Sequence, residues 1–250
     1  MSSELETRMK EQYEFRTRYY LPRRTYTIMR LDGKAFHTYC RRFEKPFDMR
    51  LVHFMDAAAM ALCTEIQGAQ FAYVQSDEIS ILLTDFATIK TDAWFDGCIQ
   101  KMVSVSASIA TQAFNDAARV YMGIQDYRHA HFDSRVFTIP DPIEVANYFI
   151  CRQKDCVRNS IQMVAQSLYS HKQLYKKNCD ELQEMIFAKG INWNNYNPGL
   201  KRGRVIHNQP EVGGLASYDA PIFTQDRSFL RDYIPIHPDF LRKPEEIENA

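Results

Sequence analysis

Residues 30–37 of this chain read Arg-Leu-Asp-Gly-Lys-Ala-Phe-His, and this stretch joins a strand pattern to a helix pattern. The β-formers and aliphatic side chains of residues 26–31 predict a strand that stops at the turn dipeptide Asp32-Gly33. Residues 34–42 then predict a short helix, whose first free N–H groups can bind phosphate. The stretch therefore places a carboxylate at the end of a strand, directly before a phosphate-binding element.

A second acidic strand end lies at residues 75–78, which read Gln-Ser-Asp-Glu. Residues 69–75 and 78–84 are rich in β-formers, so we expect a hairpin with Asp77 and Glu78 at its tip. If these strands share a sheet with residues 26–31, Asp32 and Asp77 converge on one edge, where like charges need a cation between them. Oxygen ligands favour Mg²⁺, which also takes triphosphate oxygens, and the carbonyl of Gly33 can add a ligand.

The alternative for each acidic pair is an ordinary turn or surface pair, because Asp-Gly and Asp-Glu are common dipeptides without any ligand. Their joint placement at strand ends makes the metal site a hypothesis that stands beside that alternative.

The rest of the chain alternates helix and strand patterns, which indicates one compact α+β domain with additions. Helices are expected over residues 4–18, 49–66, 96–119, 141–171 and 178–189, and further strands over 136–139 and 204–207. The last thirty residues carry four prolines and predict an extended tail packed on the body.

The net charge of zero conceals an uneven distribution. The chain has 31 Lys and Arg residues against 31 Asp and Glu, but residues 1–50 hold 12 basic and only 7 acidic side chains. Residues 51–100 hold 1 basic against 7 acidic, and residues 151–200 hold 7 against 4. The total excludes a uniformly basic polycation without excluding an RNA partner, because segments of opposite charge can face different ligands.

Composition and missing motifs exclude other classes of protein. With 45% hydrophobic and 25% charged residues, the chain is neither disordered nor collagenous. No stretch approaches the ~18 apolar residues that span a bilayer, and residues 1–10 lack the apolar core of a secretory signal, so we expect a cytoplasmic protein. The six cysteines form no C-x-x-C pair and are expected as reduced thiols. P-loop, G-x-G-x-x-G, G-x-S-x-G and H-E-x-x-H segments are absent, so any nucleotide site must be built differently.

Five ordered segments resemble those of the tRNA-His guanylyltransferase family. They are residues 30–37, 43–48 (Phe-Glu-Lys-Pro-Phe-Asp), 73–80 (Tyr-Val-Gln-Ser-Asp-Glu-Ile-Ser), 132–135 (Phe-Asp-Ser-Arg) and 152–156 (Arg-Gln-Lys-Asp-Cys). The resemblance implies a palm like that of 5′-to-3′ polymerases, which is a ferredoxin-like antiparallel sheet flanked by helices, with extra helices and a C-terminal extension.

The sequence pattern and the resemblance together give a domain plan. We expect residues 1–250 to form a single domain, with the catalytic palm core at 20–140 and a family-specific helical and strand region at 141–210. The extended tail at 211–250 does not clearly resemble the family, and no role is assigned to it. The implied partners are the 5′ end of tRNA and nucleoside triphosphates, with no membrane, and the implied assembly is a homotetramer made as a dimer of dimers.

The activity implied by the resemblance is 3′-to-5′ addition of nucleotides to the 5′ end of tRNA. ATP adenylylates the 5′-monophosphate, and the 3′-hydroxyl of an incoming nucleotide, often GTP, then attacks that end and releases AMP. Both steps are in-line displacements at phosphorus, which two carboxylate-bound Mg²⁺ ions can serve.

The resemblance assigns roles to individual residues. Asp32, the Gly33 carbonyl and Asp77 would bind two Mg²⁺, and Glu78 would join Asp32 and Asp77 as a further acidic residue needed for catalysis. The implied nucleotide contacts are Asp32, Gly33, Lys34, Ala35, Phe36, His37, Lys45, Ser76 and Asp77, and the expected RNA contacts are Arg135, Arg152, Lys154, Arg158 and Asn159. Ordinary solvated charge is the alternative for Lys45 and for the basic residues between 152 and 158.

One motif departs from the family pattern. Eukaryotic members carry His-Ile-Asn-Asn after Asp-Cys, whereas residues 157–160 here read Val-Arg-Asn-Ser. This favours a likeness to the bacterial, archaeal or viral relatives, which repair truncated tRNA 5′ ends against the opposite strand, over guanylate addition (G-1) to tRNA-His. A non-catalytic nucleotide- or RNA-binding palm and a nucleotide-cyclase-type palm are the other hypotheses, and the retained Asp32, Asp77 and Glu78 argue against the first of these.

Overall fold

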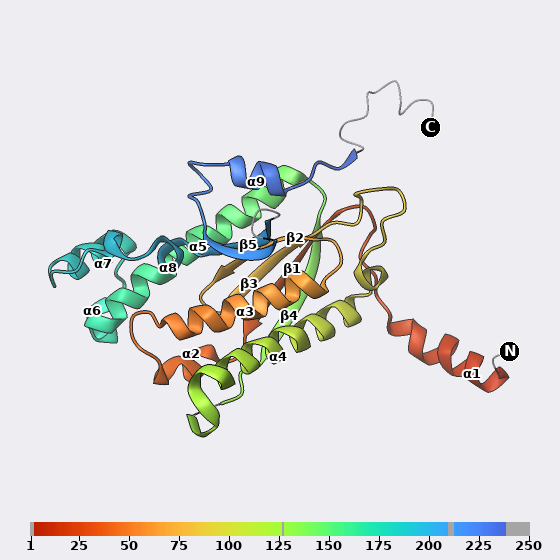
Figure 1. Ribbon diagram of the computed structural model, residues 1–250, viewed down its shortest axis with the longest axis horizontal. Helices are drawn as coiled ribbons and strands as arrows, with labels where there is room; N and C mark the ends of the chain where they lie inside the picture. The colour runs from red at the N-terminus through yellow and green to blue at the C-terminus, as the bar shows by residue number, and fades with distance from the viewer. Residues whose placement is uncertain (1–2, 127, 210–212, 239–250) are drawn as a thin grey trace.

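The computed structural model describes residues 3–126, 128–209 and 213–238, and it is built on one antiparallel sheet of six strands (Figure 1). The order across the sheet is β4-β1-β3-β2-β5-β6. The strands are β1 (Tyr26–Gly33), β2 (Ala69–Gln75), β3 (Glu78–Leu83), β4 (Phe132–Ile139), β5 (Arg204–Gln209) and β6 (Gly214–Asp219).

Helices surround this sheet. The α-helices are α1 (Glu4–Met9), α2 (Phe36–Tyr39), α3 (Met49–Glu65), α4 (Ile99–Asp126), α5 (Pro142–Leu168), α6 (His171–Leu174), α7 (Cys179–Phe187), α8 (Pro198–Arg202) and α9 (Ser228–Tyr233). A π-helical turn covers Lys10–Glu14, and 3-10 turns cover Phe15–Thr17, Cys40–Arg42, Trp94–Gly97 and Trp193–Asn195. Among the described residues, no helix combines the length and the apolarity that a membrane crossing requires.

The first four strands show the predicted topology. With α3 and α4 they follow the order β-α-β-β-α-β, and β1 pairs with both β3 and β4. This is the split βαβ arrangement of ferredoxin-like folds. The predicted α+β class, an antiparallel sheet flanked by helices, is confirmed.

The sheet separates two apolar cores, because alternate side chains of a strand point to opposite faces. Met29 and Leu31 of β1 lie in the core under α3 and α4. Tyr26 and Ile28 lie in the core that includes Phe149 of α5. Figure 1 shows α3 and α4 on one face of the sheet and α5 with α9 on the other. By this alternation, Asp32 belongs to the face that α5 covers.

Three strands extend beyond their predicted bounds. Strand β1 continues through the expected turn Asp32-Gly33, β4 begins at Phe132 instead of residue 136, and β5 ends at Gln209 instead of residue 207. For β1 and β4 the reason is pairing on both sides of β1, since Asp32 lies opposite Glu78 of β3 and opposite Asp133 of β4. The carboxylate of Asp32 therefore sits within the sheet edge, and the turn follows it.

The C-terminal part of the chain differs from the extended tail expected at 211–250. Strand β6 pairs with β5 and completes the sheet, and α9 packs Leu230 into the second core. The Tyr26 hydroxyl donates to the Pro235 carbonyl (2.8 Å) and accepts from the His237 N–H (3.1 Å), which ties the chain after α9 to β1. One sheet thus contains strands from all three of the expected regions, 20–140, 141–210 and 211–250. Residues 239–250 of the expected tail lie outside the described residues.

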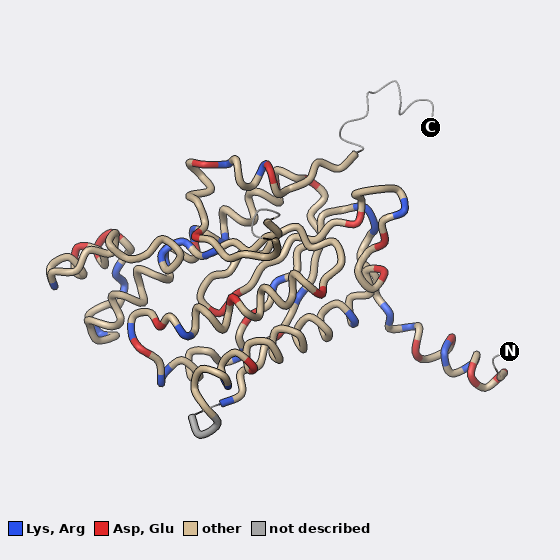
Figure 2. The backbone as a smooth tube through the Cα atoms, viewed as in Figure 1, with Lys and Arg blue, Asp and Glu red and all other residues tan. Residues whose placement is uncertain are grey.

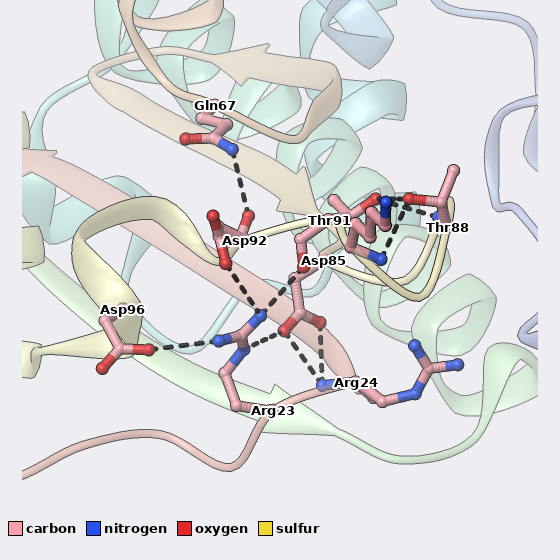
Figure 3. Close-up of polar contacts among 9 residues, drawn as sticks. Arg23, Arg24, Gln67, Asp85, Thr88, Thr91, Asp92 and Asp96 are labelled. Atoms are coloured by element: carbon pink, nitrogen blue, oxygen red, sulfur yellow. Dashed lines mark hydrogen bonds and ion pairs between the residues drawn. The ribbon is translucent and has the colours of Figure 1, made fainter.

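The segment before β1 is anchored to the loop between β3 and α4 (Figure 3). The Arg23 guanidinium donates to Asp85 (2.6 Å) and Asp96 (3.1 Å), and the Arg24 N–H donates to Asp85 (2.8 Å). Helix α1 has no buried residue and projects away from the body (Figure 1). The hydrogen bonds of Arg23 and Arg24 therefore fix where the chain enters β1.

Asp48 caps the N-terminus of helix α3 and makes a pH-dependent contribution to the stability of the protein. Its carboxylate accepts the Arg50 N–H (2.9 Å), the Glu44 N–H (3.0 Å) and the Arg50 guanidinium (2.6 Å). The Arg50 hydrogen bond in particular lowers the pKa of Asp48 to about 2. The pKa of Asp48 in the folded protein lies below the ordinary pKa of an aspartate. The contribution to stability is therefore fully present at pH values above the ordinary pKa, and it is lost as the pH falls toward the folded-state pKa.

We expect Asp48→Ala to lower the free energy of unfolding by about 1–2 kcal/mol at neutral pH, the usual range for a lost N-cap. Urea unfolding of the two proteins at neutral pH and at stepwise lower pH measures this. The difference should shrink from about pH 4 downward. An equal difference at all pH values would show that the carboxylate charge contributes nothing.

Candidate active site

Two carboxylates meet where β1 ends and the β2–β3 hairpin turns. Asp32 lies on β1, and Asp77 lies in the turn between β2 and β3. The Gly33 N–H donates to the Asp77 carbonyl (3.0 Å), so the end of β1 is tied to the hairpin turn. Burial, and then the negative charge of Asp32, raises the pKa of Asp77. Burial, and then the charges of Asp133 and Glu78, raises the pKa of Asp32.

Among the described residues neither carboxylate has a close ion-pair partner, although the charges of Arg135 and Arg30 act on Asp32 from further away and oppose the rise of its pKa. None of the ion pairs within 4.0 Å among the described residues includes Asp32 or Asp77. Groups of three His, Cys, Asp or Glu side chains that could hold a metal are likewise not found in the described part of the chain. Two neighbouring, half-buried carboxylates and a backbone carbonyl are nonetheless a donor set that suits Mg²⁺, which usually completes its shell with phosphate and water oxygens.

Glu78 is placed differently from the other two acids. It accepts hydrogen bonds from Arg152 of α5 (3.0 Å) and from the Gln75 side chain (3.0 Å). The Arg30 guanidinium lies 3.7 Å away, and Arg152 also pairs with Asp155. The charge of Glu78 is thus balanced inside the protein, and its contacts join the strand end to α5.

The backbone around the two acids is shaped for close approach. A Cβ on Gly33 would lie 2.3 Å from the Phe36 ring, so glycine lets Phe36 pack beneath the end of β1. Ala35 and Ser76 hold positive φ angles of 56° and 46°, which non-glycine residues adopt infrequently. Such backbone conformations are concentrated at functional sites, and here they flank Asp32 and Asp77.

A cavity of about 370 Å³ opens beside Asp77. Its walls include Phe36, His37, Lys45, Ser76 and Asp77, and on the other side Asn159, Met163 and Gln166 of α5 and Leu200 of α8. This volume is within the range of small-ligand sites, roughly 300–1,000 Å³. Of the predicted nucleotide contacts, Asp32, Gly33, Lys34 and Ala35 are outside the cavity lining.

The predicted RNA contacts do not gather on one surface. Asn159 lines the cavity, whereas Arg152 is largely buried and paired with Glu78. Arg158 pairs with Asp155 (2.8 Å), Arg135 donates to Asp133 (3.2 Å), and Lys154 is exposed. Their roles in RNA binding stay predictions.

Sequence reasoning missed two parts of this site. Asp133 belongs to the Phe-Asp-Ser-Arg motif, but its place opposite Asp32 depends on the register between β1 and β4. The cavity wall from α5 and α8 was missed as well, because Met163, Gln166 and Leu200 follow no motif. The spacing of the apolar positions on α5 carries no information about which of them faces a cavity.

Known proteins share this chain's fold and sequence. A bacterial tRNA(His) guanylyltransferase (Thg1)-like protein in complex with ATP superposes with a TM-score of 0.87 at 40% identity, covering 92% of this chain and 99% of that one. A bacterial protein of the same description in complex with GTP gives a TM-score of 0.79 at 36% identity, covering 93% and 100%. The tRNA(His) guanylyltransferase of Schizosaccharomyces pombe is 30% identical over 200 residues, which are 74% of this chain and 74% of that protein.

The family described as tRNAHis guanylyltransferase matches residues 6–140, which is more than half of the chain. That range contains β1, the β2–β3 hairpin and both carboxylates, Asp32 and Asp77. The ordered motifs predicted the same assignment: this chain belongs to the tRNAHis guanylyltransferase (Thg1) family of nucleotidyltransferases.

Proposed function

We propose that this protein extends the 5′ end of truncated tRNA in the 3′-to-5′ direction, using the opposite strand as template. The observation that carries the proposal is the pair Asp32 and Asp77, two neighbouring carboxylates that form no ion pair within 4.0 Å with any described residue. Asp77 also lines a cavity of about 370 Å³. Similar bacterial proteins bind ATP and GTP, which supports nucleotides as the ligands of that cavity.

The residues present fit a magnesium site. We propose that Asp32, the Gly33 carbonyl and Asp77 hold two Mg²⁺ ions, which together with substrate oxygens would satisfy the two carboxylates. Bound there, Mg²⁺ would neutralise phosphate charge and favour the ionised form of an attacking hydroxyl.

The side chains around the cavity orient the reactants. His37 of α2 and Lys45, which follows that helix, line the cavity. The Lys45 ammonium can pair there with phosphate oxygens. In the first step a 5′-phosphate oxygen of tRNA attacks the α-phosphorus of ATP and pyrophosphate leaves. In the second, the 3′-hydroxyl of the next nucleotide attacks the activated 5′ phosphorus and AMP leaves. Both displacements are in line, so holding the groups in place is the main task of the protein.

Residues 157–160 favour repair over guanylate addition to tRNA-His. Ser160 stands at the last position of the eukaryotic His-Ile-Asn-Asn motif, and here it is buried, accepting from the Trp193 ring N–H (3.2 Å) and donating to the Val157 carbonyl (2.8 Å). Among these four residues only Asn159 and Ser160 line the cavity. Addition of G-1 to tRNA-His is the second candidate function, which the family assignment alone favours.

The test uses a tRNA-His and a second tRNA, each prepared with and without its first 5′ nucleotide, incubated with ATP, all four nucleoside triphosphates and Mg²⁺. Repair predicts that both truncated tRNAs gain the nucleotide that pairs with the opposite strand. Guanylate addition to full-length tRNA-His alone would replace repair by the second candidate. Cyclic nucleotide formed without RNA would favour a cyclase, and nucleotide binding without any product would favour a binding module.

The cellular setting is proposed on the same resemblance. We place the enzyme in the cytoplasm as a homotetramer, a dimer of dimers, and size-exclusion chromatography with light scattering tests the assembly.

A further inference from the structure

The turn between α5 and α7 presents a basic surface that the nucleotide cavity does not use. From Cys156 to Cys179 the chain contains no Asp or Glu, although the segment carries Arg158, Lys172, Lys176 and Lys177. Apart from Leu174, residues 171–178 are all exposed. Figure 2 shows basic residues on the α6 turn and acidic residues on α7, the next helix along the chain. This turn is therefore a local positive surface on a chain of zero net charge.

Tyr175 stands among these cations with its ring exposed. The residue is 64% exposed, and the Lys176 ammonium lies 5.4 Å from the ring centroid. Lys176 holds a positive φ of 61°, an infrequent conformation for lysine. Lys177 is paired with Glu181 (2.7 Å), whereas no acidic side chain of the described residues lies within 4.0 Å of the Lys172 or Lys176 ammonium. One unbalanced cation, Lys176, thus lies over an exposed aromatic ring, and a second, Lys172, stands three positions before that ring in the same turn.

This surface is close to the cavity along α5. Met163 and Gln166 line the cavity, and the helix ends at Leu168. Gln166 lies two positions before that end, which is about 3 Å along the helix axis at the rise of an α-helix, and the turn begins directly after it. A polynucleotide whose end lies in the cavity can therefore reach the turn within a few nucleotides.

We propose that the turn at residues 169–178 is an RNA-binding surface, where Lys172 and Lys176 bind backbone phosphates and Tyr175 stacks on an unpaired base. This inference rests on the proposed function for its choice of RNA as the partner. Stacking on aromatic side chains beside a cationic track is the general means of binding single-stranded nucleic acid. An acidic peptide would pair with the lysines but would have no use for an exposed ring between them.

The test measures binding of a fluorescent tRNA by anisotropy without nucleotides, at several salt concentrations. Tyr175→Ala should weaken binding by about 5- to 150-fold, the range for one stacked base, while Tyr175→Phe stays within about twofold of wild type. The double variant Lys172→Ala, Lys176→Ala should reduce the salt slope by about 0.7–0.9 per cation removed. Lys90→Ala is the matched control, because Lys90 is an exposed cation in the distant loop between β3 and α4, and its RNA binding should equal that of wild type.

Three results would overturn the inference. Tyr175→Ala binding RNA as tightly as wild type removes the stacking contact, even if the lysine variant binds more weakly. Equal losses in Tyr175→Phe and Tyr175→Ala would mean that the hydroxyl, not the ring, makes the contact. An unchanged salt slope in the double variant removes the phosphate contacts. If the wild type adds nucleotides to tRNA and these variants bind RNA normally, only the proposed RNA-binding surface is refuted. If the wild type adds no nucleotide, the proposed function itself is refuted.

Discussion

Replacing Asp77 by Asn is expected to abolish nucleotide addition while the protein stays folded. The amide has the same shape, so the hairpin turn can be kept, but the negative charge that would hold Mg²⁺ is lost. Because removal of one key electrostatic group at an active site typically costs about 10²–10³ in rate, we expect a loss of about 10³-fold or more for a metal ligand. Initial rates of 5′ addition, measured over a range of Mg²⁺ concentrations, check this.

The same variant is expected to be at least as stable as wild type. Burial and Asp32 raise the pKa of Asp77, so its ionised form is disfavoured in the folded state above that pKa. Urea unfolding at neutral pH should therefore show an equal or higher free energy of unfolding for Asp77→Asn. Asp116→Asn is the control, since Asp116 is an exposed acid of α4 paired with Arg119, and its rate should be unchanged. An Asp77→Asn rate close to that of wild type would refute the metal assignment.

Arg152→Ala is expected to have the largest effect on stability. Arg152 and Glu78 side chains are each only 13% exposed and are 3.0 Å apart, so removing the arginine leaves a buried carboxylate without its main partner. Losing one member of a buried pair typically costs about 3–5 kcal/mol. Arg158→Ala is the matched control, because Arg158 contacts the neighbouring Asp155 but is 55% exposed, and its loss should cost at most about 1 kcal/mol.

A second substitution separates charge from packing in this pair. Glu78→Gln added to Arg152→Ala removes the unpaired charge and should recover part of the lost stability, as urea unfolding of the single and double variants would show. The Arg152→Ala variant also tests the RNA contact predicted for Arg152. RNA binding is then measured without urea, under conditions in which the variant is folded. If Arg152→Ala were as stable as Arg158→Ala, the arginine would not be the anchor between the sheet and α5.

Local signals made much of the fold predictable. The runs of β-formers at 26–31, 69–75 and 78–84 and the turn dipeptides between elements placed the strands of the palm and the acids at their ends. The Ala- and Met-rich stretch at 49–66 predicted α3, which begins at Met49 directly after its N-cap Asp48. These features depend on residues a few positions apart, which a single sequence displays.

Long-range pairings were not predictable in the same way. Glu78 and Arg152 are 74 residues apart, and the Arg204–Asp56 pair that joins β5 to α3 spans 148 residues. Strand β6 reads Gly-Leu-Ala-Ser-Tyr-Asp, without a β-branched residue, and forms because the edge of β5 offers unpaired backbone groups. Likewise Asp133 joins the site only through the register of β4. Each of these depends on which distant element becomes a neighbour.

The direction of addition tests the central claim most directly. A 5′-monophosphorylated tRNA lacking its first nucleotide is incubated with ATP, Mg²⁺ and one α-³²P-labelled nucleoside triphosphate at a time, and the labelled end is mapped by digestion from each end. The proposed function predicts label at the 5′ end only, and only from the nucleotide that pairs with the opposite strand. Label at the 3′ end, label independent of the opposite base, or no incorporation at all would contradict it.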